Sequence, residues 1–290
     1  MGPQRGSPFG NTLAAEPFTP PTLRASEFAQ IRELAYNKFG LDLKEGKQNL
    51  IVTRLSKELR RLGLTSFEQY CRYVSSDHSG EALIEMADAL TTNFTSFLRE
   101  QAHFEFLRKG LTAQLPRTGP VHIWSCASST GEEPYSILFT LLETLGPGAD
   151  VRILATDIST RALKAGTGAV YDDERLAGLP SGWLPRYFLK GNGRWQGSYR
   201  VRPEYRERVR FQRFNLVTDQ PASQRYPAVF CRNVAIYFDK ATQAAVARKL
   251  ASALEPGGYL FIGHSESLSG MDHGLSYVQP ALYRKSVKEQ

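Results

Sequence analysis

The stretch VHIWSCASSTGEEP at positions 121–134 decides the fold. It begins with a short run of β-forming residues, 121–124, and continues with seven small residues, 125–131, that let the backbone approach a ligand closely. Thr130 and Glu133 have the spacing of a helix capping box, and Pro134 is tolerated in the first turn of a helix. The stretch therefore predicts a strand, a tight turn and a helix.

The next apolar run, at positions 151–157, predicts a second strand with Asp157 at its carboxyl end. In such a strand–helix–strand unit, an acid at this place can accept hydrogen bonds from both ribose hydroxyls of a nucleoside. The turn lacks the G-x-G-x-x-G pattern of dinucleotide sites, and Glu132 and Glu133 would repel phosphates. A nucleoside with a positive charge suits these residues, which points to S-adenosylmethionine. The alternative is that Asp157 only caps a helix or is solvated, and that Glu133 is only the capping partner of Thr130.

Composition limits the class of protein. A chain of 290 residues allows one large domain or two smaller ones, and its net charge of +7 suggests an acidic partner: a protein, a nucleic acid or an anionic membrane. No apolar run approaches the ~20 residues of a membrane span, so we expect no direct membrane insertion. The N-terminus lacks the apolar core of a secretory signal, and the three cysteines form no C-x-x-C pattern. We therefore expect a cytoplasmic protein.

Helical spacing of apolar residues dominates the N-terminal part of the chain. It extends over 26–39, 45–62, 66–74 and 81–90, and it returns over 97–115. Before these helices the chain is rich in Pro and Gly, which indicates disorder. We predict a disordered tail at 1–21, a helical domain at 22–92, an interdomain linker and helix at 93–118, and an α/β domain at 119–288.

Predicted strands alternate with helices in the α/β domain, which is typical of a largely parallel sheet covered on both faces. Further strands are expected at 209–211, 228–233 and 259–262, with a closing hairpin at 277–284. Closely spaced glycines around Trp195 indicate a small β-subdomain at about 180–207. Ligands bind at the carboxyl ends of parallel strands. Candidate residues there are Asp157, Asn215, Arg232, Asn233 and Tyr237, joined by Asn93, Thr95 and Arg99 if the helical domain packs over the crevice.

Several other chemistries lack a pattern in this sequence. The histidines show no metal-ligand spacing, so we expect no metal, and neither a G-x-S-x-G motif nor a Walker A motif occurs. Cations do repeat along one face of the second predicted helix, away from its apolar stripe. They are Lys47, Arg54, Lys57 and Arg61. This basic stripe is either a solvated face or a docking surface for an acidic helix.

Four segments resemble the CheR family of chemotaxis receptor methyltransferases: TNFTSFLR at 92–99, WSCASSTGEEPYS at 124–136, CRNVAIYF at 231–238 and GHSES at 263–267. The resemblance extends over residues 25–285. It implies an all-helical N-terminal domain and a class I S-adenosylmethionine-dependent methyltransferase domain, which is Rossmann-like, with an inserted β-subdomain. It also implies methyl esterification of glutamate side chains on the cytoplasmic helices of chemoreceptors, with S-adenosylhomocysteine as the second product.

The resemblance further implies the roles of particular residues. Arg99 and Tyr237 would be catalytic. The cofactor would contact Asn93, Thr95, Arg99, Glu133 (with Glu132 as the second choice), Asp157, Asn215, Leu216, Cys231, Arg232 and Asn233.

The partner implied is the chemoreceptor cytoplasmic domain, without nucleic acid. In some relatives the β-subdomain also holds a C-terminal receptor peptide, and residues 191–197 have either that role or the role of an ordinary hairpin. Two other functions stay open. One is methylation of a different acceptor, such as RNA or a small acid, and the other is non-catalytic sensing of S-adenosylmethionine.

Overall fold

The computed structural model describes residues 20–91, 94–115 and 119–287. Most of the predicted tail at 1–21 and the predicted site residue Asn93 therefore lie outside the described residues. Within residues 20–91 the chain folds into helices, as the spacing predicts, and their apolar stripes are buried against one another. These helices are α1 (Ala25–Phe39), α2 (Gln48–Leu62), α3 (Phe67–Ser76) and α4 (Glu81–Leu90).

Local signals account for most of the helix ends. Gly40 and Gly63 follow α1 and α2 in the left-handed conformation that glycine adopts without strain. Ser66 caps the start of α3, since its hydroxyl accepts the N–H of Gln69 at 3.2 Å. The predicted helix over 97–115 is wrong in part. It begins at Gln101 as α5 (Gln101–Phe106) and continues as a π-helical turn, η1 (Leu107–Leu111), and a 3₁₀ turn, η2 (Thr112–Gln114).

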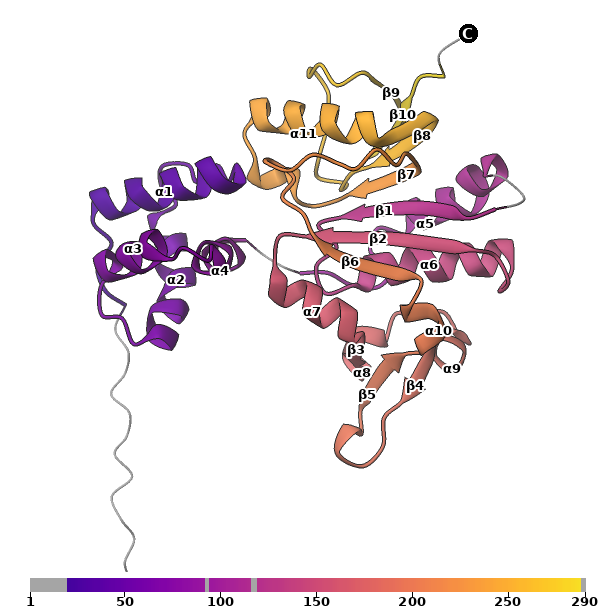
Figure 1. The fold of residues 1–290 in the computed structure, drawn as a ribbon, viewed down its shortest axis with the longest axis horizontal. Coiled ribbons are helices and arrows are strands. Elements are labelled where there is room, and N and C mark those ends of the chain that lie inside the picture. The colour runs from indigo at the N-terminus through magenta and orange to yellow at the C-terminus, as the bar shows by residue number, and fades with distance from the viewer. Residues whose placement is uncertain (1–19, 92–93, 116–118, 288–290) are drawn as a thin grey trace, which may run out of the picture.

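The predicted parallel sheet is confirmed, with the strand order β6-β2-β1-β7-β8-β10-β9 (Figure 1). β10 runs antiparallel to both of its neighbours and forms the predicted closing hairpin with β9. The order of the strands reverses between β1 and β7, which in open α/β sheets is the place where ligands bind. The strands are β1 (Val121–Cys126), β2 (Val151–Asp157), β6 (Val209–Arg213), β7 (Tyr226–Cys231), β8 (Leu254–Phe261), β9 (Leu275–Gln279) and β10 (Leu282–Lys285).

Helices cover both faces of this sheet (Figure 1). On one side lie α6 (Glu132–Leu145) and α7 (Thr160–Gly168), and on the other lies α11 (Lys240–Ala253). Asp239 caps α11 by accepting the N–H of Thr242. Because the central strands are buried on both faces, they read as nearly continuous apolar runs.

A second, three-stranded antiparallel sheet hangs below the main sheet in Figure 1, with the order β3-β5-β4. Its first strand precedes the range 180–207 in which the sequence indicated a β-subdomain. The elements are β3 (Val170–Asp172), β4 (Phe188–Lys190) and β5 (Ser198–Val201), with the short helices α8 (Asp173–Leu176), α9 (Trp183–Tyr187), η3 (Gly193–Trp195) and α10 (Pro203–Arg206).

The helical domain packs against the carboxyl ends of the main strands. Leu41 forms an isolated bridge with Phe238, after the short turn η4 (Ala235–Tyr237), and one apolar core includes residues of both domains. Asn215 donates from its side chain to the carbonyl of Lys38 at the end of α1, at 2.8 Å. Helices of the N-terminal domain thus cover the carboxyl ends of the strands, where ligands bind in open α/β sheets. Among the described residues, no helix is long and apolar enough to cross a bilayer.

Candidate functional site

A cavity of about 540 Å³ lies between the helical domain and the carboxyl ends of β1, β2 and β7. This volume is within the roughly 300–1,000 Å³ typical of small-molecule sites. Of the residues proposed from the sequence, the cavity is lined by Thr95, Arg99, Glu133, Asp157, Asn215, Leu216, Arg232, Asn233 and Tyr237. Glu132 and Cys231 are buried elsewhere and do not line it.

Asp157 ends β2 and first organises the turn beside it. One of its carboxylate oxygens accepts the N–H of Ser129 at 2.8 Å, and the other accepts the N–H of Ser159 at 2.9 Å. Burial raises the pKa of Asp157, and the nearby Asp88 raises it further. Each carboxylate oxygen can accept a second hydrogen bond, so Asp157 remains able to bind ligand hydroxyls.

Glu133 points toward β7 rather than toward its own helix end. Its carboxylate accepts the hydroxyl of Ser125 at 2.7 Å and a guanidinium N–H of Arg232 at 2.9 Å. The predicted capping box of Thr130 with Glu133 is therefore wrong. The N-cap of α6 is Gly131, and no side chain caps it.

Glu132 faces the opposite way and is fully buried on the side of the small sheet. It accepts the hydroxyl of Thr130 and a guanidinium N–H of Arg175, both at 2.7 Å. Gly131 directly precedes the two glutamates with a φ of 100°, and a Cβ there would lie 2.8 Å from the hydroxyl of Tyr171. The turn therefore requires glycine at this point.

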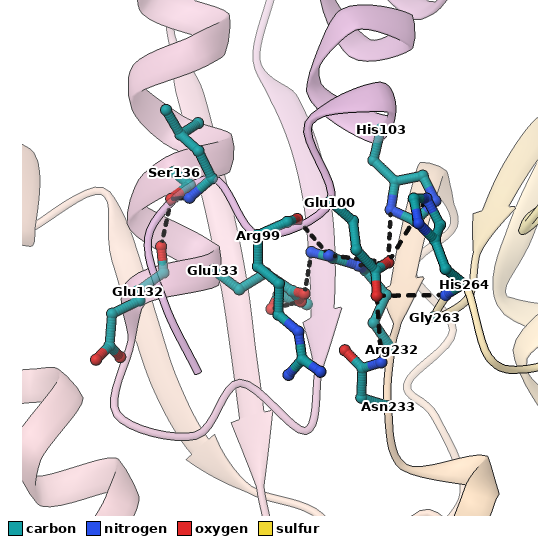
Figure 2. A network of polar contacts seen from close by, with 12 residues as sticks. Arg99, Glu100, His103, Glu132, Glu133, Ser136, Arg232, Asn233, Gly263 and His264 are labelled. Carbon is teal, nitrogen blue, oxygen red and sulfur yellow. Dashed lines mark hydrogen bonds and ion pairs between the residues drawn. The ribbon is translucent and has the colours of Figure 1, made fainter. Parts of the chain in front are cut away.

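Arg232 connects the cavity to a second acid, Glu100 (Figure 2). One of its Nη atoms lies 3.1 Å from Oε2 of Glu100, and the guanidinium also donates to the carbonyl of Arg99. Burial alone would raise the pKa of Glu100, but the charge of Arg232 and the hydrogen bonds from His264, Asn233 and Arg232 together outweigh burial, so the pKa is lowered. Arg232 thus holds together the segment of Arg99, the loop after β7 and the start of α6.

The loop after β7 is held by Glu266, from the GHSES segment. Its carboxylate accepts the N–H of Asn233 at 2.9 Å and that of Ala235 at 2.7 Å. Gly263 must be glycine, because a Cβ there would lie 2.4 Å from the side-chain nitrogen of Asn233. Glu266 and Glu100 are site-forming residues that the sequence analysis did not single out.

Left-handed backbone at residues other than glycine gathers around the cavity. Such conformations cost free energy and tend to occur at functional sites. Among the described residues around the cavity they occur at Leu98, Glu100, Ala127, Ser129 and Asn233, with φ between 48° and 63°.

The two residues proposed as catalytic both line the cavity. Arg99 donates to the carbonyl of Phe94 at 2.9 Å, with its guanidinium 5.8 Å from the ring of the same residue. Tyr237 ends the turn η4, and its carbonyl accepts the N–H of Asp42 in the helical domain. The helical domain therefore contributes to the position of Tyr237.

The basic stripe on α2 is only partly exposed. Arg54 is half-buried and donates to the carbonyl of Leu90, and Arg61 is paired with Glu58 and Glu85. Lys47 and Lys57 are exposed, and neither makes an ion pair within the part of the chain that the structure describes.

Comparisons with known proteins agree over nearly the whole chain. The model "CheR methyltransferase, SAM binding domain" matches residues 93–283, and the model "CheR methyltransferase, all-alpha domain" matches residues 26–91. The chain is 41% identical over 259 residues to chemotaxis protein methyltransferase 2 of Pseudomonas aeruginosa, which covers 89% of this chain and 92% of that one. It is 40% identical over 270 residues to the chemotaxis protein methyltransferase of Escherichia coli, with 91% and 92% covered.

Proposed function

The chain belongs to the CheR methyltransferase family, and we propose that it transfers a methyl group from S-adenosylmethionine to glutamate side chains of chemoreceptor cytoplasmic helices, forming methyl esters. The observation that carries this proposal is that Asp157, Glu133, Arg99 and Tyr237 line the same cavity.

The charges in the cavity fit this cofactor. Asp88, Glu133 and Asp157 line it as acids, against Arg99 and Arg232 as cations, and Arg232 is already engaged by two carboxylates. A ligand with a positive charge is favoured in such surroundings, whereas a pyrophosphate is not. Asp157 would hold the ribose hydroxyls, and the small residues Ala127 and Ser129 leave room for the ligand against the backbone.

S-adenosylmethionine supplies a methyl group activated by a positively charged sulfur. A glutamate carboxylate with a pKa near 4.3 is ionised at neutral pH, so the site needs no general base. Its oxygen forms the ester bond to the methyl carbon while the carbon–sulfur bond breaks, and no proton moves. What the protein supplies is orientation, which can contribute several kcal/mol.

Arg99 is proposed to hold one oxygen of the acceptor carboxylate and leave the other free to react. Binding both oxygens would weaken the nucleophile. Tyr237, which also lines the cavity, would orient the acceptor or shape the path of the methyl group. Thr95, Asn215, Leu216 and Asn233 would complete the cofactor pocket.

The receptor would dock on the basic stripe of α2, through Lys47 and Lys57 above all, because these two are exposed and make no ion pair among the described residues. Replacing Lys57 with Glu should raise the receptor KM and leave cofactor affinity unchanged, and wild-type activity should fall with added salt. If the kinetics change in neither test, the basic stripe is a solvated face and not a docking surface.

The small sheet is proposed to hold a C-terminal receptor peptide, which would raise the local concentration of the substrate. Trp195 lies at its tip with 55% of its surface exposed, and the guanidinium of Arg194 lies 5.3 Å from the ring centroid. A peptide that binds there should change the fluorescence of this tryptophan, and a Trp195→Phe variant should lose the signal.

The main test is methyl transfer itself. The protein is incubated with methyl-labelled S-adenosylmethionine and receptor cytoplasmic fragments, and alkali-labile label is measured in a single turnover. Arg99→Ala should lower the rate sharply, because its contact is tightest when carboxylate and sulfonium align. Arg108→Ala, an exposed arginine on η1, is the matched control and should not change it.

The other candidate functions give different results in the same assay. Label that is stable to alkali, or that appears in RNA, would indicate a different acceptor. Cofactor binding without transfer to any receptor fragment would indicate a sensor. If Arg99→Ala changes only the receptor KM, Arg99 is a docking residue.

A further inference from the structure

Two histidines far apart in the sequence meet at Glu100, outside the lining of the cavity (Figure 2). Nδ1 of His103, on α5, lies 3.5 Å from Oε2 of Glu100, and Nε2 of His264, in the loop after β8, lies 4.0 Å from the same oxygen. One ligand atom of each residue lies within 4.8 Å of the other two. We call these three residues the His–His–Glu cluster.

His103 is the unusual member of this cluster. Its side chain is 1% exposed, yet neither ring nitrogen has a hydrogen-bond partner. A buried polar group without a partner costs about 1–3 kcal/mol, and such groups in native structures call for an explanation. Because neither ring nitrogen of His103 is engaged, a lone pair of its ring is available to an ion. Neutral imidazole is the form that binds metal ions.

Two imidazoles and one carboxylate are a ligand set typical of zinc sites that keep an open position. Bonds of about 2.0–2.1 Å in a tetrahedral site place the ligand atoms roughly 3.3 Å apart. The 3.5 Å separation already meets this, and the 4.0 Å separation needs only a small movement of His264. The side chain of His264 is 48% exposed, so it can move and the ion can enter from solvent.

We propose that Glu100, His103 and His264 form a binding site for a divalent transition-metal ion of the zinc class, and that metal binding weakens cofactor binding. The second part follows from the shared oxygen. Oε2 of Glu100 also lies 3.1 Å from Arg232, whose other guanidinium nitrogen holds Glu133 at 2.9 Å. A metal ion on this oxygen displaces Arg232 and repels it, and Arg232 lines the cavity. This second part rests on the proposed role of Arg232 toward the cofactor.

The site itself is tested by titrating tag-free protein with Zn²⁺ in a calorimeter. The variant is His264→Gln, at a side chain that is 48% exposed, and the control is His78→Gln, at a histidine outside the cluster. We expect Zn²⁺ affinity to fall by about tenfold or more in His264→Gln and to stay unchanged in His78→Gln. Mg²⁺, which prefers oxygen ligands, should not compete. Equal Zn²⁺ affinity in both variants and wild type would place the ion elsewhere and overturn the proposal.

The effect on the cofactor is measured separately. In wild type, saturating Zn²⁺ should weaken S-adenosylhomocysteine binding, and in His264→Gln the same Zn²⁺ concentration should not. If Zn²⁺ binds at the cluster and the affinity for S-adenosylhomocysteine does not change, the proposed effect on the cofactor is wrong and the proposed metal site stands. If wild type binds no S-adenosylhomocysteine even without Zn²⁺, the proposed function fails instead, and the Zn²⁺ titration still decides the site.

Discussion

Two neighbouring glutamates at the start of α6 serve opposite sides of the molecule. Glu133 turns toward the cavity and pairs with Arg232, whose side chain is 2% exposed. Glu132 turns toward the small sheet and pairs with Arg175, whose side chain is 49% exposed. Burial raises the pKa of both carboxyl groups, yet only one of the two cations that stabilise them is itself buried.

The network of ion pairs on the cavity side is shielded from water, whereas the ion pair on the small-sheet side is open to water. On the cavity side, Arg232 also reaches Glu100 and the carbonyl of Arg99, so one cation stabilises two buried acids and a strained segment. On the small-sheet side, Arg175 can exchange its partner for water. We therefore expect substitutions on the cavity side to cost both stability and cofactor affinity, and those on the small-sheet side to cost less stability and no cofactor affinity.

The largest effect is expected for Arg232→Ala. It leaves Glu133 and Glu100 buried without their cation, and removing one partner of a buried ion pair costs about 3–5 kcal/mol. Urea unfolding should show this loss in the free energy of unfolding, and calorimetry should show no cofactor binding. A loss of unfolding free energy below about 1 kcal/mol would mean that water reaches the ion pairs of Arg232. The cavity side and the small-sheet side would then not differ in this respect.

Asp157→Ala is expected to come next. Its carboxylate organises the turn and is proposed to bind the ribose, so cofactor affinity should weaken by about 1.5–3 kcal/mol, the range for losing a charged hydrogen-bonding group. The matched variant on the other side is Asp172→Ala, which removes the cap of α8 and should leave cofactor affinity unchanged. Unchanged affinity in a folded Asp157→Ala protein would remove Asp157 from the site.

The sequence predicted those site residues that lie where regular elements end. Asp157 and Arg232 follow apolar runs, and parallel strands bring their carboxyl ends to one edge of the sheet, so the meeting of these residues could be expected from pattern alone. The largely parallel sheet and the helical domain were predicted from periodicity and from the resemblance to CheR proteins, whereas the order of the strands was not predicted.

What the sequence did not predict depends on tertiary contacts. Glu100 lies in a segment whose apolar spacing is helical, and the left-handed backbone at this residue is stabilised by contacts with Arg232, Asn233 and the N–H of His264. Thr130 and Glu133 have capping-box spacing, but the buried charge of Arg232 is a stronger partner for Glu133 than a helix end is. The histidines of the His–His–Glu cluster are too far apart in sequence for ligand spacing to show.

A smaller effect is expected for Arg175→Gln. The pair with Glu132 lies between the surface and the buried class, because one partner is half-exposed, so we expect a loss of about 1–2 kcal/mol in unfolding free energy. Arg186→Gln is the matched control. It breaks a more exposed pair with Glu143, so its loss of unfolding free energy should be smaller than that of Arg175→Gln. Cofactor affinity should stay near wild type in both variants, and a tenfold loss in Arg175→Gln would show that the small sheet does affect the cofactor.

The smallest effect at neutral pH is expected for Glu132→Gln, which removes the buried charge. Its amide oxygen can still accept from Arg175, and its amide nitrogen can donate to the hydroxyl oxygen of Thr130. Burial raises the pKa of Glu132 in the folded protein above its value of 4.5 in the unfolded chain. The folded state therefore binds the proton more tightly, and wild type loses stability as the pH rises from about 4.5 through the folded pKa. The glutamine variant lacks this loss, so its stability relative to wild type should increase from pH 4 to pH 7. Urea unfolding of both proteins across this range measures the difference. A constant difference would mean that Arg175 fully offsets burial, and the two glutamates would then be electrostatically equivalent despite their different partners.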